Sequence, residues 1–189
     1  MIKDLIIKNR TYRRFYQEVE ISEGTLREMV DCARLSASGR NLQPIRYILS
    51  WEKEKNSKIY KYLAWAAYLT DWDGPPEGER PSGYIIFLGD KDLSQNFAVD
   101  QGIFAQSMLL CAVEKGLGGC IIASIKRDGL REELKIPEKY EILMVLAAGK
   151  PKEEVVIEPM PADGNYKYWR DEKNVHHVPK RALDELVIG

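Results

Sequence analysis

The spacing of apolar residues along the chain predicts five helices. The clearest covers residues 97–115, where alanine, leucine and valine recur on one stripe and Gly116 follows as a C-terminal cap. A second has its apolar stripe between Leu26 and Ala33 and begins after Ser22, whose hydroxyl can cap a helix N-terminus. Three shorter helices are predicted over residues 2–8, 59–67 and 130–134.

Four segments have the pattern of strands. Apolar and polar residues alternate from Ile45 to Trp51, directly after Pro44. Continuous apolar runs over residues 84–88, 119–123 and 142–148 are typical of buried strands. Helices mixed with short buried strands indicate an α+β fold or a three-layer α/β/α arrangement, in one domain over residues 1–189.

Two segments lack a clear period. Residues 70–83 contain Asp-Gly-Pro-Pro and Trp72, and a loop of this length is either a functional lid or a surface excursion with its Trp packed back. After Pro151 the chain carries Tyr166, Tyr168 and Trp169 but no strong apolar period. We expect this C-terminal segment to form no core of its own and to wrap another surface.

Charge and composition narrow the class of partner. A net charge of -1 gives no global field toward nucleic acid or an anionic membrane, so neither partner is expected. No apolar run approaches the roughly 20 residues of a membrane helix, and the charged N-terminus does not resemble a signal peptide. Three widely spaced cysteines favour a reducing compartment, so we expect a cytoplasmic protein.

Two polar motifs stand out against this neutral background. Residues 10–15, Arg-Thr-Tyr-Arg-Arg-Phe, offer three guanidinium groups that match phosphate oxygens, although a solvated basic turn would have the same sequence. Residues 38–44, Ser-Gly-Arg-Asn-Leu-Gln-Pro, supply a hydroxyl and two amides suited to a heterocycle. With Lys180 and Arg181 near the other end of the chain, they favour a phosphorylated ring compound, and flavin mononucleotide (FMN) is the best candidate.

Other chemical patterns are weaker. Gly116-Leu-Gly-Gly119 follows a helix and precedes a strand, the reverse of a dinucleotide-binding fingerprint. His176 and His177 would point to opposite faces of a strand, and packing or surface roles are favoured over a metal site. Cys120 lies in an apolar strand, which favours a core residue over a nucleophile.

The sequence resembles the nitroreductase family of FMN-dependent oxidoreductases over nearly its whole length. The resemblance is carried by five ordered segments: residues 10–15, residues 37–44, the helix and Gly-Leu-Gly turn of residues 100–119, Leu-Lys-Ile-Pro at 134–137 followed by Ala-Gly-Lys-Pro at 148–151, and Pro-Lys-Arg at 179–181. Asn9 departs from the family, because many members carry another Arg there.

The resemblance implies a three-layer α/β/α sandwich with a mixed, mostly antiparallel sheet, and a homodimer with FMN at the interface. Its C-terminal extension would wrap the partner subunit. The residues expected at the phosphate and ribityl oxygens are Arg10, Thr11, Arg13, Lys180 and Arg181. Ser38, Asn41 and Gln43 of either chain would contact the ribityl chain or ring edge, and Gly149 would permit close approach near the phosphate. Backbone near Ile122, Ala123 and Ser124 would face the pyrimidine and N5 side of the flavin.

The implied reaction is hydride transfer from NAD(P)H through flavin N5 to a small electrophilic acceptor, such as a nitroaromatic or a quinone, by ping-pong kinetics. No side chain is assigned a catalytic role, because the cofactor supplies the chemistry. Trp72 is a candidate for shaping the acceptor pocket. Two alternatives stay open: the same fold with reductive dehalogenation or flavin fragmentation, and a non-catalytic flavin-binding protein.

Overall fold

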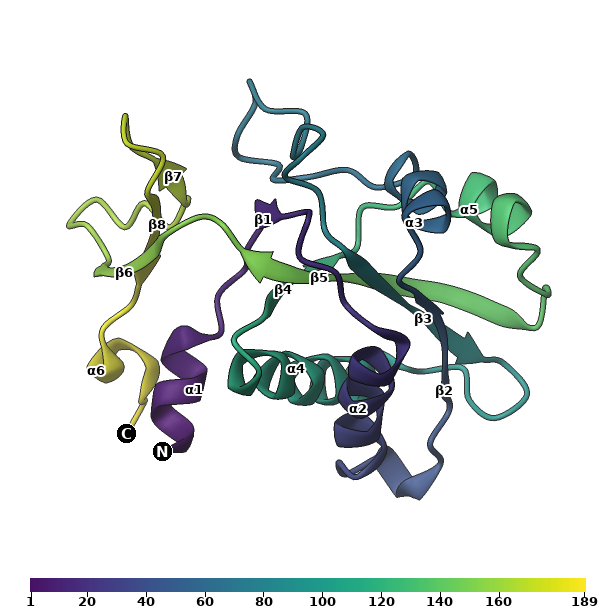
Figure 1. The fold of residues 1–189 in the computed structure, drawn as a ribbon. Coiled ribbons are helices and arrows are strands. Elements are labelled where there is room, and N and C mark those ends of the chain that lie inside the picture. The colour runs from purple at the N-terminus through teal and green to yellow at the C-terminus, as the bar shows by residue number, and fades with distance from the viewer.

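A five-stranded antiparallel sheet forms the centre of the molecule (Figure 1). The computed structural model describes every residue from Met1 to Gly189. The strands are β1 (Phe15–Tyr16), β2 (Ile45–Ser50), β3 (Gly83–Asp90), β4 (Gly118–Ile122) and β5 (Tyr140–Pro151). Their order is β1-β5-β3-β2, and β4 pairs with the same long strand β5 as β1 does.

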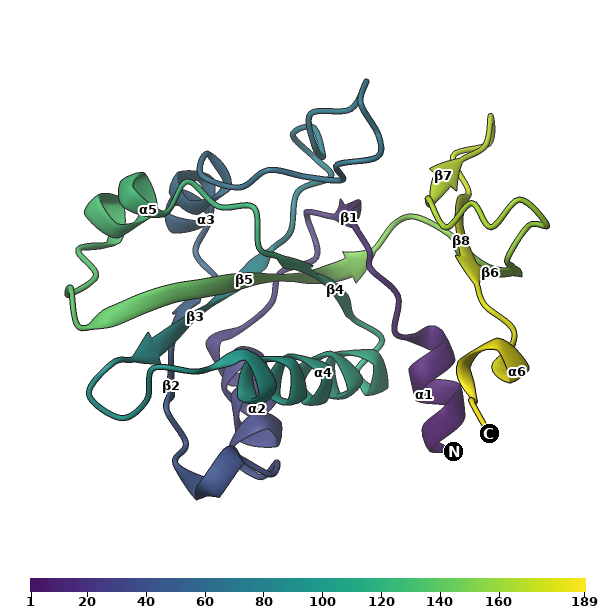
Figure 2. The same cartoon turned by 180° about the vertical axis from the view of Figure 1, so that it is seen from behind.

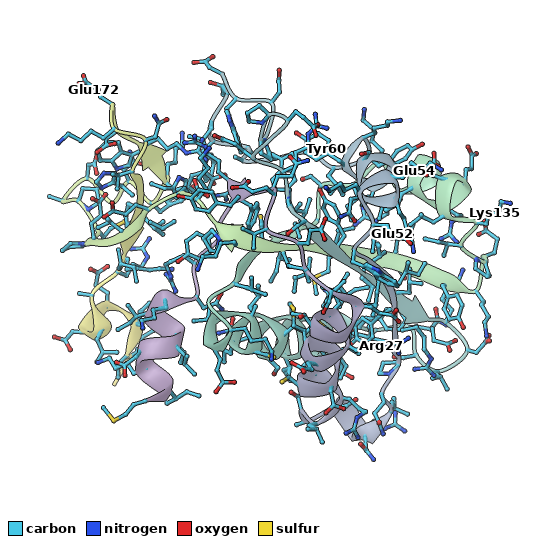
Figure 3. All side chains as sticks on the ribbon, in the orientation of Figure 1. Arg27, Glu52, Glu54, Tyr60, Lys135 and Glu172 are labelled. Atoms are coloured by element: carbon cyan, nitrogen blue, oxygen red, sulfur yellow. The ribbon has the colours of Figure 1, made fainter.

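Helices cover both faces of this sheet, so the predicted three-layer arrangement is confirmed (Figures 1 and 2). One face packs against α2 (Glu23–Arg34) and α4 (Ala98–Glu114), and the other against α3 (Lys53–Tyr60) and α5 (Arg127–Leu134). Because side chains alternate along a strand, β3 supplies Ile85 and Phe87 to the first core and Ile86 and Leu88 to the second. Figure 3 shows side chains filling the space on both sides of the sheet.

Local chemistry explains where most elements begin and end. Ser22 Oγ accepts the Thr25 N–H at 3.1 Å and caps α2, as the sequence predicts. Gly116 takes a φ of 68° just after α4, a conformation that favours glycine. The helix predicted over residues 59–67 is wrong in position: α3 ends at Tyr60, and Leu63 instead forms a bridge with Ile125.

The C-terminal segment forms a second, three-stranded sheet that the sequence did not predict, but this sheet encloses no apolar core of its own, as expected. It consists of β6 (Val155–Pro159), β7 (Trp169–Arg170) and β8 (His176–Lys180), followed by the short α6 (Leu183–Leu186). β8 lies between a parallel β6 and an antiparallel β7. Backbone pairing across distant residues creates this sheet, which is why apolar periodicity did not reveal it.

The two ends of the chain lie side by side. Both views place α1 (Ile2–Lys8) next to α6, with the N- and C-termini close together (Figures 1 and 2). The C-terminal sheet packs on its own chain, and wrapping of a partner subunit stays a prediction. No helix combines the length and the apolar character that crossing a membrane requires.

Candidate functional site

Arg13 is buried at the junction of the main sheet and the C-terminal sheet. The chain approaches it by running past β4, where Tyr12 N–H donates to the Gly119 carbonyl at 3.0 Å. Gly119 has to be small, because a Cβ there would lie 2.5 Å from the carbonyl oxygen of Ala147. This close packing fixes the backbone of the arginine motif, and Arg13 is only 7% exposed.

Arg13 and the end of β4 line one hollow of about 360 Å³. Its other walls come from residues 64–66, which include the buried Trp65. The structure therefore brings together Arg13, Ile122, Ala123 and Ser124, four residues that the sequence analysis assigned to one ligand. Cys120 also lines the hollow, and burial raises the pKa of its thiol to about 11, in keeping with a core residue.

The rim of the hollow offers free backbone donors. The carbonyl of Ala123 accepts from Arg127 Nη2 at 3.2 Å, and the carbonyl of Ser124 accepts from the Ala64 N–H at 3.0 Å. The N–H groups of Ala123 and Ser124 make no hydrogen bond within the chain, and both residues are exposed. This rim can therefore donate two hydrogen bonds to a ligand.

The C-terminal sheet holds Arg13 in place. The Glu153 carboxylate accepts the Arg13 backbone N–H, and its other oxygen accepts from Arg170 Nη2 at 2.9 Å. The Arg13 guanidinium lies 4.5 Å from the centre of the Tyr168 ring and donates from Nη1 to His176 Nε2 at 3.2 Å. Tyr168, directly before β7, and His176, in β8, thus orient the Arg13 guanidinium.

His176 is neutral in this environment. It is 1% exposed, and burial followed by the charge of Arg13 lowers its pKa to about 4. Since Arg13 can only donate, Nε2 of His176 accepts and Nδ1 carries the hydrogen. That N–H has no partner inside the chain.

Unpartnered buried donors gather around Arg13. They are Trp65 Nε1, Arg170 Nε and His176 Nδ1. Trp65 shares the hollow with Arg13, His176 contacts Arg13, and Arg170 shares the Glu153 carboxylate with it. Because buried polar groups are normally paired, Trp65 Nε1, whose residue lines the hollow, suits a ligand that carries oxygen acceptors. FMN, with its ring carbonyls and phosphate, fits that description.

The loop of residues 38–43 lies elsewhere on the same chain. Ser38 Oγ donates to Asp100 Oδ2 at 2.5 Å and accepts the Gln43 N–H, near the start of α4. Asn41 and Gln43 are exposed, with φ values of 56° and 49°. Gly119, which lies beside the arginine motif, packs instead against Leu109 of α4. Leu109 lies about 14 Å along this helix from Asp100, the partner of Ser38. One chain therefore does not bring Ser38, Asn41 and Gln43 to Arg13.

The other predicted residues are placed as follows. Arg10 Nη2 donates to the Ile6 carbonyl at 2.8 Å, and Thr11 is exposed and bridged to Gly119. Lys180 is exposed at the end of β8, about 13 Å along the strand from His176. Arg181, also exposed, pairs with Glu185 at 3.3 Å.

Gly149 and Trp72 have packing partners within the chain. A Cβ on Gly149 would lie 2.7 Å from the Phe15 ring, so close packing accounts for this glycine without a ligand. The Trp72 ring is half-buried beneath the guanidinium of Arg170, whose Cζ lies 4.4 Å from the ring centre. Their roles toward a ligand stay predictions.

Sequence reasoning did not assign Trp65, Glu153, Tyr168 or His176 to the ligand site. No motif marks Glu153, whose partner Arg13 lies 140 residues away. His176 was correctly placed in a strand, but its contact with Arg13 depends on the fold of the C-terminal segment.

Comparison with known proteins agrees with this geometry. The sequence profile of the nitroreductase family matches residues 6–150. The chain belongs to the nitroreductase family. A curated relative in that comparison is the NADPH-flavin oxidoreductase of Vibrio harveyi, 24% identical over 177 residues that cover 84% of this chain and 70% of the relative.

Two solved structures illustrate the shared nitroreductase fold. An FMN-dependent nitroreductase from Clostridium difficile R20291 superposes with a TM-score of 0.66 at 25% identity, covering 82% of this chain and 89% of the other. A nitroreductase family protein from Streptococcus pneumoniae TIGR4 superposes with a TM-score of 0.70 at 17% identity, covering 86% and 97%. The family profile ends at residue 150, so the C-terminal sheet lies outside it.

Proposed function

We propose that the protein is an FMN-dependent oxidoreductase that transfers hydride from NAD(P)H to a small electrophilic acceptor such as a nitroaromatic or a quinone. The observation that carries the proposal is the hollow that Arg13 lines together with Ala123 and Ser124, whose N–H groups have no partner within the chain. Family membership supports it, as do relatives described as an NADPH-flavin oxidoreductase and an FMN-dependent nitroreductase.

Each part of the chain has a distinct task in this function. When bound, FMN supplies the redox chemistry by taking hydride at N5 and passing it on in a ping-pong cycle. Arg13, which the resemblance assigns to the phosphate and ribityl oxygens, lines the hollow with Ala123 and Ser124 and would donate a charge-assisted hydrogen bond to an oxygen of the cofactor there. The N–H groups of Ala123 and Ser124 would orient the opposite edge of the ring. Arg10, Thr11, Lys180 and Arg181 would serve the phosphate and ribityl oxygens.

A homodimer would complete the site. The loop of Ser38, Asn41 and Gln43 is remote from Arg13 in one chain, so in this proposal a second copy supplies it. Exposed apolar residues on three helices support such a contact: they are Ile2, Ile6 and Ile7 on α1, Val99 and Ile103 on α4, and Leu183 and Leu186 on α6. A cytoplasmic setting agrees with the three cysteines being free.

Anaerobic spectroscopy tests the reaction. The full-length protein, loaded with FMN, is expected to lose its visible flavin absorbance on addition of NADH or NADPH and to regain it with a nitroaromatic or a quinone. A flavin that keeps its colour at millimolar nicotinamide would identify a flavin-binding protein without this activity.

Removing the Arg13 side chain tests the site. Arg13→Gln is expected to weaken FMN binding about tenfold to over a hundredfold, since it loses a charge-assisted hydrogen bond. Arg34→Gln is the matched control, because Arg34 is exposed and pairs with Asp31 on the surface of α2. Equal FMN affinity in wild type and in folded Arg13→Gln would contradict the assignment.

A further inference from the structure

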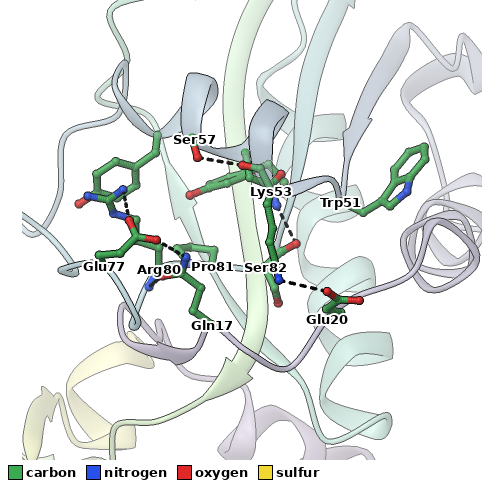
Figure 4. A pocket seen from close by; sticks show the side chains of 12 residues that line it. Gln17, Glu20, Trp51, Lys53, Ser57, Glu77, Arg80, Pro81 and Ser82 are labelled. Carbon is green, nitrogen blue, oxygen red and sulfur yellow. Dashed lines mark hydrogen bonds and ion pairs between the residues drawn. The ribbon is translucent and has the colours of Figure 1, made fainter.

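A second polar pocket lies between α3 and the chain that leads into β3 (Figure 4). It shares no lining residue with the Arg13 hollow. Its lining residues are Gln17, Glu20, Trp51, Lys53, Asn56, Ser57, Tyr60, Glu77, Arg80, Pro81, Ser82 and Tyr84. Tyr60, at the end of α3, marks its position in Figure 3.

The inner wall of this pocket carries hydrogen-bonding groups that the protein leaves unused. Ser82 is 6% exposed, and its buried hydroxyl has no partner. Arg80 Nε is also buried without a partner. Tyr84, 1% exposed, turns its phenol toward the same space, and burial raises the pKa of that phenol so that it stays protonated. An unpaired buried polar group is costly, which indicates that these groups have a ligand.

The charges around the pocket are arranged with the cation inside. Arg80 Nη1 pairs with Glu77 Oε2 at 2.7 Å, but the Arg80 side chain is 29% exposed and that of Glu77 74%. The Arg80 guanidinium is further held by the Tyr60 ring, with Cζ 4.1 Å from its centre. At the mouth, Lys53 and Glu20 form a solvent-exposed pair that is free to separate. Arg80 is therefore the cation that an anionic ligand inside the pocket would meet, in competition with Glu77.

The other residues that line the pocket indicate which class of anion would fit. Three groups that can donate hydrogen bonds, Arg80 Nε, Ser82 Oγ and the Tyr84 hydroxyl, suit the two oxygens of a carboxylate. Pro81 lies beside Arg80, Trp51 adds apolar surface on the opposite side of the pocket, and the Tyr60 ring carries the Arg80 guanidinium on one face. We propose that this pocket binds a small carboxylate with a planar apolar body, independently of the flavin site.

Sodium benzoate is a suitable probe, with benzamide as its neutral counterpart of nearly the same shape. In ¹H–¹⁵N spectra of the full-length, FMN-loaded protein, benzoate is expected to shift the amide signals of Arg80, Ser82 and Tyr84. Benzamide is expected to bind at least tenfold more weakly, because it lacks the charge. Equal binding of the two compounds, or shifts confined to other regions, would overturn the proposal.

Two variants test the residues. Ser82→Ala is expected to weaken benzoate binding about tenfold or more, while Ser57→Ala, whose hydroxyl already donates to the Lys53 carbonyl, stays within about twofold. Arg80→Lys keeps the charge but removes Nε–H, and it should weaken binding to a similar extent if Ser82→Ala does not fold. Wild-type affinity in either pocket variant would overturn the proposal.

Discussion

The main body and the C-terminal sheet are stabilised in different ways. The body encloses two apolar cores of 16 and 12 buried residues on opposite faces of its sheet. Of residues 152–189, only Glu153, His176 and Pro179 are buried. Hydrogen bonds, a buried ion pair and aromatic contacts hold this sheet to Arg13 and to the segment that carries Tyr68 and Trp72. The C-terminal sheet should therefore open before the body, and its stability depends on Arg13.

The largest expected effect is the loss of a core side chain from the body. Phe87→Ala removes a ring that is fully buried between β3 and the helices, and it is expected to lower the free energy of unfolding by about 3–5 kcal/mol. Ile157→Ala, in β6 and 39% exposed, is expected to cost about 0.5 kcal/mol or less. Urea unfolding measures both. Similar costs for the two variants would remove the distinction between the regions.

The second effect is a loss of stability confined to the C-terminal sheet, which amide hydrogen exchange can distinguish from a loss in the main body. Glu153→Gln leaves the Arg170 guanidinium without its buried counter-charge, and it is expected to destabilise the C-terminal sheet by about 1–3 kcal/mol. Amides of residues 155–180 should then exchange faster, while those of β3 and β5 keep their protection. Glu154→Gln, at an exposed residue next to Glu153, is the control. Loss of protection throughout β3 would show that the sheet is not an independent unit.

The third effect is a difference in pH dependence, and it is small near neutral pH and grows as pH falls. His176 has a pKa of about 4 when folded and about 6.5 when unfolded, so the unfolded state binds more protons between these values and the C-terminal sheet loses stability as pH falls from 6.5 to 4. In the main body, hydrogen bonding from Arg14 lowers the pKa of Glu79 to about 2. The stability that ionised Glu79 contributes is therefore lost only as pH falls from about 4.5 to 2.

Exchange rates of the two regions at pH 6.5, 5.5 and 4.5 measure this difference. The C-terminal amides should lose protection first, and His176→Phe should remove the dependence in that window. A C-terminal sheet that becomes more stable as pH falls from 6.5 to 4.5 would contradict the neutral state of His176.

The same contrast explains what the sequence could predict. Local patterns were sufficient for the Ser22 cap, the buried strand at Tyr84–Leu88 and the long helix before Gly116, since each is defined by neighbours in sequence. The grouping of Arg13 with Ile122, Ala123 and Ser124 followed from the family resemblance.

The contacts that hold Arg13 could not be predicted in this way. His176 meets Arg13 across 163 residues, on a sheet whose parallel pairing of β6 with β8 leaves no apolar period. The position of α3 was missed because Ile59 and Leu63 have helical spacing but belong to different elements, a helix and an irregular segment that pairs near Ile125.

The central claim is that the Arg13 hollow, completed by a second subunit, holds FMN. The most direct measurement is amide hydrogen exchange of the wild-type protein with and without FMN. We expect FMN to slow exchange in residues 10–13, 38–43 and 122–124 together, and to leave β3 unchanged. Protection confined to residues 53–84 around the second pocket, or no protection in any segment, would contradict the claim.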